Sequence, residues 1–188
     1  MKSDDVIYES CNYYANKGNE VVREFFEEKY NMFKLKFVEP EDNHSVYDLQ
    51  MDIETKDGKT IHYYIEVKLK FNKHFFDDYT YITRKKVGEI KEFMEGKDKE
   101  TDRFIYFNFY PMCSYVAMFN LTKPKDYDIS FIENRNATAN ETDIEPYITK
   151  VAMAMLPMKN DEDFKMFRHS TDVEIRYNNR VWQHGRMI

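Results

Sequence analysis

Two carboxylates and a lysine occur in a spacing that suits phosphate chemistry. Asp48 and Glu66 are separated by seventeen residues, and Lys68 follows Glu66 two positions later. Two carboxylates on adjacent strands do not both ionise cheaply unless a cation lies between them. A hard divalent ion such as Mg²⁺ prefers these oxygen ligands and keeps positions for water and a phosphate. The residue types therefore predict metal-assisted phosphodiester hydrolysis, in which Lys68 acts on the attacking water or stabilises developing charge.

Two alternating segments joined by a tight turn would bring these residues together. Apolar residues occupy every second position in 49–53 and 61–69, as in half-buried strands. The residues between them predict a three-residue loop with Gly58 in the left-handed conformation. That register places Asp48 opposite Glu66. It also pairs the apolar residues with one another: Leu49 with Ile65, Met51 with Tyr63 and Ile53 with Ile61.

The remaining pattern predicts helices and strands on both sides of this hairpin. In order, we expect a helix over about 9–30, a strand over 33–37, the hairpin, an aromatic loop over 71–81, a helix capped by Thr83 and ending at Gly96, and strands over 103–110 and 114–121. The later residues predict a strand or helix over 148–156, a short helix over 161–167 and a strand or hairpin over 173–182. This mixture of elements indicates an α/β fold.

Composition limits the kind of protein that the sequence describes. The 188 residues include 34 acidic and 28 basic side chains, for a net charge of -6, which argues against nonspecific coating of a polyanion. Without a repeat or linker we expect one domain over 1–188, with a core over about 12–121 and a C-terminal extension over 122–188. Two cysteines and no apolar spanning segment favour a cytoplasmic protein away from membranes.

The Asp48 position, the hairpin and the run Glu66-Val67-Lys68 resemble the core motif of the PD-(D/E)XK nuclease superfamily. The resemblance covers about residues 12–121. It implies the restriction-endonuclease-like αβββαβ core, in which helices flank a mixed central sheet. It also implies a nuclease that uses Mg²⁺, or Mn²⁺ as a substitute, and hydrolyses DNA by metal-activated water; RNA is not excluded as the substrate. Tyr47 stands where the motif's proline would be.

The same resemblance implies roles for individual residues. Asp48 and Glu66 would bind the metal together with the carbonyl of Val67, and Lys68 would assist the nucleophile or transition state. In the first helix Glu20 matches a family glutamate that supplies a further metal or water ligand.

In several branches of the family a basic residue at the start of the second helix faces the site. Lys86 matches this position, and Lys85 is the second choice. The alternative to these functional roles is that the helix glutamates and lysines are ordinary solvated charges.

Basic residues gather after the motif. Residues 68–91 carry seven Lys and Arg against three Asp and Glu, with Phe and Tyr interleaved, which would suit a phosphate backbone and unpaired bases. The candidates for nucleic-acid contact are Lys70, Lys73, Arg84 and Lys85. A sparser group would add to the nucleic-acid groove or to a homodimer contact: Arg168, Arg176, Arg180 and Arg186, with Trp182.

A non-enzymatic function remains an alternative. The chain could keep the nuclease fold without the chemistry and serve as a nucleic-acid-binding or protein-binding module, because a fold does not fix a function. The Asn-, Lys- and Tyr-rich composition suggests a phage or mobile-element origin.

Overall fold

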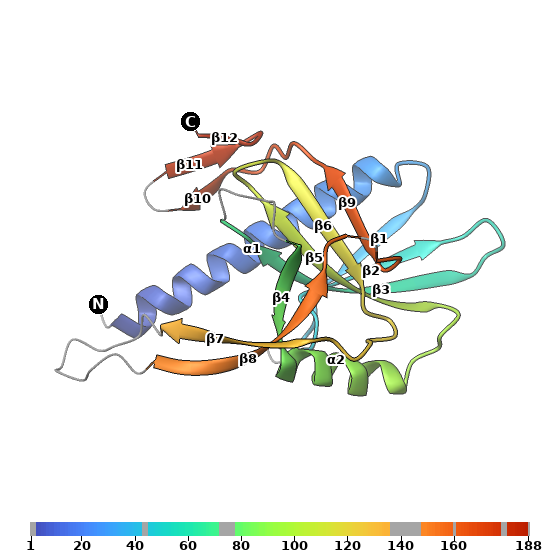
Figure 1. Ribbon diagram of the computed structural model, residues 1–188. Helices are drawn as coiled ribbons and strands as arrows, with labels where there is room; N and C mark the ends of the chain where they lie inside the picture. Colours follow the sequence, from blue (N-terminus) through green and yellow to red (C-terminus); the bar gives the residue numbers. More distant parts are fainter. Residues whose placement is uncertain are drawn as a thin grey trace.

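The computed structural model describes residues 3–42, 45–71, 78–135, 148–159, 161–177 and 180–187. In chain order the elements are α1 (Ser3–Lys29), β1 (Leu35–Val38), β2 (Leu49–Glu54), β3 (Thr60–Leu69), β4 (Tyr79–Thr83), α2 (Arg84–Glu95), β5 (Asp102–Tyr110), β6 (Tyr115–Asn120), β7 (Ile129–Arg135), β8 (Ile148–Pro157), β9 (Phe164–Arg168), β10 (Ile175–Tyr177), β11 (Arg180–Gln183) and β12 (Arg186–Met187) (Figure 1). Neither helix has a stretch long and apolar enough to cross a membrane, within these residues.

A six-stranded sheet with the order β1-β2-β3-β5-β6-β9 forms the centre of the fold. β3 and β5 run parallel, and the other neighbouring pairs of this sheet are antiparallel. A parallel pair needs a crossover connection, which β4 and α2 supply here. The chain is therefore an α/β protein with a mixed sheet and two helices in its described part. This confirms the fold class that the sequence predicts.

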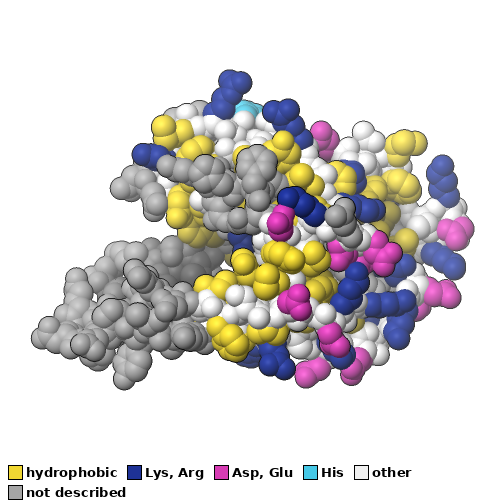
Figure 2. Space-filling model, viewed as in Figure 1, with side chains coloured by type: hydrophobic (Ala, Val, Ile, Leu, Met, Phe, Trp, Pro, Cys, Tyr) yellow, Lys and Arg dark blue, Asp and Glu magenta, His cyan; other side chains and the backbone are white. Residues whose placement is uncertain are grey.

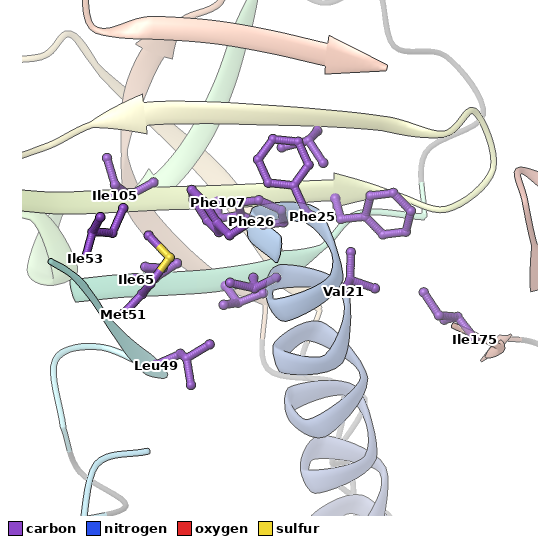
Figure 3. Packing of buried hydrophobic residues seen from close by; sticks show 14 residues of the cluster. Val21, Phe25, Phe26, Leu49, Met51, Ile53, Ile65, Ile105, Phe107 and Ile175 are labelled. Atoms are coloured by element: carbon purple, nitrogen blue, oxygen red, sulfur yellow. The ribbon is translucent and has the colours of Figure 1, made fainter. Parts of the chain in front are cut away.

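α1 covers one face of the central sheet and contacts β3 and β5. Its buried residues recur at the three- and four-residue spacing of a single helix face. They are Val21, Val22, Phe25 and Phe26. Figure 3 shows Val21, Phe25 and Phe26 packed beside buried side chains of β2, β3 and β5. This packing fixes the position of the helix over the Asp48–Glu66 hairpin.

α2 and a second sheet, with the order β4-β8-β7, cover the opposite face. Ile90 and Met94 of α2 and Leu156 of β8 belong to one buried cluster with Phe104 and Tyr106 of β5. Alternate residues of β5 belong instead to the cluster under α1. β5 is thus buried on both faces of the central sheet, as expected for a strand of a parallel pair.

The residues after 122 contribute strands to these sheets. β9 forms the edge of the central sheet beside β6, and β7 and β8 build the second sheet with β4. The three-stranded β10-β11-β12 sheet is held to the earlier part of the chain, because Tyr177 stacks on Phe71 with ring centroids 3.9 Å apart. The Glu24 carboxylate of α1 also accepts a hydrogen bond from the Thr171 hydroxyl at 3.0 Å.

The predicted hairpin forms in the predicted register. β2 and β3 pair as expected: Leu49 with Ile65, Met51 with Tyr63 and Ile53 with Ile61. Gly58 has a φ of 79°, so it takes the left-handed conformation that the turn requires. The structure also confirms Thr83 as the cap of the second helix and a hairpin near the C-terminus, formed by β10 and β11.

Other expectations were wrong or incomplete. The short helix predicted over 161–167 is instead strand β9, which pairs with the otherwise open edge of β6. The aromatic loop contains strand β4, and β7 was not predicted. The residues predicted as strand or helix over 148–156 form strand β8. The first helix begins at Ser3, earlier than its apolar pattern indicates.

Replacing Gly18 with Ala is expected to destabilise the protein by about 1–3 kcal/mol, because α1 packs directly against β3 there. A Cβ on Gly18 would lie 2.8 Å from Cγ1 of Val67, whose β-branched side chain has little freedom to move. Urea unfolding would measure the loss. Val67→Ala in the Gly18→Ala background should restore part of it, whereas purely additive effects of the two changes would show that this contact is not the cause.

Candidate active site on the central hairpin

Asp48 lies directly before β2, and Glu66 lies within β3. The backbone N–H of Asp48 donates to the carbonyl of Ile65 at 2.9 Å, so strand pairing extends to this residue. The Asp48 carboxylate turns onto β3, where Oδ2 accepts a hydrogen bond from the N–H of Val67 at 2.7 Å. The register of the hairpin therefore holds the two carboxylates on neighbouring strands.

The Glu66 carboxylate is buried between two lysines. Glu66 is 3% exposed, and its Oε1 lies 2.6 Å from Nζ of Lys68 on the same strand. Its Oε2 lies 2.9 Å from Nζ of Lys86 on α2. A buried carboxylate needs such partners, because an unpaired charge loses its hydration without compensation. Both ammonium groups therefore pair with Glu66, and both also attract the Asp48 carboxylate electrostatically.

The electrostatics of the site show the crowding of like charges. Burial and then repulsion from Glu66 raise the pKa of Asp48, although Lys68, Lys86 and the Val67 N–H act in the opposite direction. Burial works to lower the pKa of Lys68, but attraction to Glu66 and Asp48 outweighs it, so the pKa is raised. Lys68 is therefore protonated at neutral pH, and Asp48 ionises less readily than an exposed aspartate.

Local structure explains how Lys86 reaches the site. Thr83 caps α2, and its Oγ1 accepts a hydrogen bond from the N–H of Lys86 at 3.2 Å. Ile90 is fully buried and anchors the same helix on the sheet. Tyr47, at the position of the motif's proline, packs on Phe93 of α2 with ring centroids 5.7 Å apart. The predicted position of Lys86 beside the carboxylates matches the structure.

The first helix presents a different residue to the site from the one expected. The Glu20 carboxylate is half-exposed and pairs with Lys17 at 2.6 Å. The structure does not bring Glu20 together with Asp48 and Glu66, and no three His, Cys, Asp or Glu side chains form a metal-sized group in the described part of the chain. Asn19 is buried instead, and its Nδ2 donates to the carbonyl of Asp48 at 3.4 Å.

A buried asparagine on β5 was missed by the sequence reasoning. Asn108 pairs in register with Lys68 across the parallel strands and is fully buried. Both polar atoms of its amide lack a hydrogen-bond partner among the residues that the structure describes. A polar residue inside the apolar run 104–110 was the available signal, since buried polar side chains are usually paired.

The candidates for nucleic-acid contact are spread over two elements. Lys70 directly follows β3, and burial together with repulsion from Lys68 lowers its pKa. Arg84 and Lys85 are exposed at the start of α2, and Lys73 lies outside the described residues. Arg84 lines a groove of about 310 Å³ between α2 and residues 124–129, which also contains Lys91.

Acidic and basic side chains are interspersed on the visible surface. Figure 2 shows Lys and Arg beside Asp and Glu over α2 and the neighbouring strands. The C-terminal arginines are all exposed and lie on strands of the central sheet or the terminal hairpin: Arg168, Arg176, Arg180 and Arg186. Among its described residues, this face therefore carries no continuous basic patch.

The donor set fits a hard divalent cation. Asp48 and Glu66 offer carboxylate oxygens, and burial followed by repulsion from Glu66 raises the pKa of Asp48. A cation would relieve that repulsion, and it would compete with the two ammonium groups for Glu66. The residues that would hold Mg²⁺ or Mn²⁺ are Asp48, Glu66 and the carbonyl of Val67.

Comparisons with known proteins add no family assignment. No family model, curated protein or solved structure shows significant similarity to this chain.

Proposed function

We propose that the chain is a magnesium-dependent nuclease with the restriction-endonuclease-like αβββαβ core of the PD-(D/E)XK superfamily. The observation that carries the proposal is the buried Glu66 carboxylate of β3, which lies between Lys68 and Lys86 and across the hairpin from Asp48. The order of α1, β1, β2, β3, α2, β5 and β6 supports the core, with β4 as an additional strand.

The proposed roles follow from charge and position. Asp48 and Glu66 hold the divalent cation, together with the Val67 carbonyl. Lys68 is charged at neutral pH, so it orients the water or stabilises negative charge on the phosphate rather than removing a proton. Lys86 supports Glu66 from the other side at 2.9 Å. When bound, the cation lowers the pKa of water and neutralises phosphate charge.

Lys68→Ala is expected to lower the cleavage rate by about 100-fold or more while leaving DNA binding nearly unchanged. The reason is that Lys68 acts on charge that develops during the reaction. Cleavage with Mg²⁺ and with Mn²⁺ should be measured on linear, nicked, branched and single-stranded DNA, and on RNA. Lys36→Ala is a matched control, since Lys36 is exposed on β1 of the same sheet and has no role in the proposed site. Divalent-dependent cleavage that survives in Lys68→Ala would contradict the assignment.

One observation favours the alternative, a nuclease-fold module that binds nucleic acid or protein without cleaving it. The two lysines neutralise Glu66 without any metal, at 2.6 Å and 2.9 Å. Such an ion-pair group could be purely structural. A metal titration distinguishes the two functions, because the structural group predicts no thermal stabilisation by Mg²⁺ or Mn²⁺ and the nuclease predicts a clear one.

A further inference from the structure

Among the described residues, no hydrogen-bond donor reaches the buried side-chain oxygen of Asn19. The side chain is 9% exposed, and Nδ2 donates to the carbonyl of Asp48 at 3.4 Å. That contact fixes the orientation of the amide, because only the nitrogen can donate to a carbonyl oxygen. Oδ1 is buried as well, and no donor from the described residues reaches it. A buried acceptor in this state costs free energy unless a ligand or water supplies a donor.

The Nδ2 contact places Asn19 beside Asp48, a residue of the proposed metal site. Asn19 contacts the backbone of Asp48, whose carboxylate is one of the two that would hold the cation. The neighbouring Gly18 lies against Val67, so α1 approaches the hairpin closely here. Glu20, by contrast, is 48% exposed at its side chain and already paired with Lys17.

We infer that Oδ1 of Asn19 accepts a hydrogen bond from a water molecule in the coordination shell of the divalent cation. The inference rests on the proposed function. Mg²⁺ keeps several of its waters when it binds to proteins, and each of those waters is a strong donor. An amide oxygen is an acceptor only, which matches that donor. Asn19 is thus a positioning residue, and it takes the place on α1 that the resemblance assigns to Glu20.

The test is a calorimetric titration of the full chain with Mn²⁺ in the absence of nucleic acid. Asn19→Ala is expected to raise the Kd for Mn²⁺ by about 10–100-fold, as loss of an outer hydrogen-bond partner of a metal does. Asn19→Asp keeps an oxygen at this position and should bind at least as tightly as the unchanged protein. Asn16→Ala is the matched control, an exposed asparagine one turn earlier on α1, and should leave the Kd unchanged.

The outcomes separate this inference from the proposed function. If the unchanged protein binds neither Mg²⁺ nor Mn²⁺, both are overturned. If it binds metal but cleaves no substrate, only the proposed function is overturned. An unchanged Kd in Asn19→Ala overturns the inference alone, and so does a larger effect of Glu20→Gln. Equal weakening in Asn19→Ala and Asn19→Asp would assign the effect to the lost Nδ2 contact and overturn it too.

A purely structural role has its own signature. It would change the free energy of unfolding measured without metal and leave the Kd for Mn²⁺ as it was. Urea unfolding of Asn19→Ala in a chelator therefore accompanies the titration, and a stability change with an unchanged Kd overturns the inference.

Discussion

Lys86→Met is expected to lower the free energy of unfolding by about 2–3 kcal/mol, the largest stability effect we expect from a single charge at the site. Lys86 contacts Glu66 at 2.9 Å, and the Glu66 side chain is 5% exposed. Removing one partner leaves a buried carboxylate with less compensation, which costs more than the pair contributes. Lys68 remains at 2.6 Å from the same carboxylate, so the loss stays below that of a fully orphaned charge. Urea unfolding in a chelator measures it.

Two comparisons make this result specific to the buried pair. Lys85→Met removes the preceding lysine, which is 88% exposed and lies 3.5 Å from Glu89, and should cost no more than about 0.5 kcal/mol. Glu66→Gln combined with Lys86→Met should recover most of the loss, because the buried Glu66 charge is then gone and Lys68, whose side chain is 48% exposed, keeps its hydration. Mg²⁺ should also recover part of it by replacing the missing positive charge. Equal losses in the Lys85 and Lys86 variants would show that the Glu66 contact contributes nothing.

The hairpin was predictable because its constraints are local. Strict alternation in 49–53 and 61–69 sets which face each residue occupies, and Gly58 allows the turn that fixes the register. A slip of one residue would expose the whole apolar face, so the register that opposes Asp48 to Glu66 follows from the sequence. The position of Lys86 was expected from the family resemblance, and Thr83, which caps α2, sets its place on the helix.

The missed features depend on contacts between distant segments. Strand β9 forms because β6 offers an open edge, and residues 164–168 alone do not reveal that partner. The same holds for β4, which pairs with β8 more than seventy residues later.

The apolar pattern of the first helix did not determine which of its polar residues faces the hairpin. Asn19 and Glu20 are adjacent, and the rotation of α1 is set by Val21, Val22, Phe25 and Phe26 packing on the sheet. The family pattern pointed to Glu20, whereas packing turns Asn19 inward. The choice between two neighbouring helix residues therefore needed the tertiary structure.

Asp48→Asn is expected to abolish function and raise stability at the same time. Losing a carboxylate of the proposed metal site should lower cleavage by at least about 100-fold and remove the thermal stabilisation by Mg²⁺. Without metal the variant should be more stable at neutral pH, by on the order of 1 kcal/mol, because burial and repulsion from Glu66 raise the pKa of Asp48. The Asn side chain still offers an oxygen to the N–H of Val67, so the hydrogen bond seen at 2.7 Å is kept.

The pH dependence tests the cause of that gain. A raised pKa in the folded protein means that ionised Asp48 costs stability above that pKa, and the cost disappears as pH falls below the ordinary aspartate pKa of about 3.9. Urea unfolding of both proteins in a chelator should show a gap at neutral pH that closes in acid. A constant gap at all pH values would assign the gain to packing instead. A variant less stable at neutral pH would mean that attraction to Lys68 and Lys86 outweighs the repulsion from Glu66, which would remove the electrostatic argument for a cation between the carboxylates.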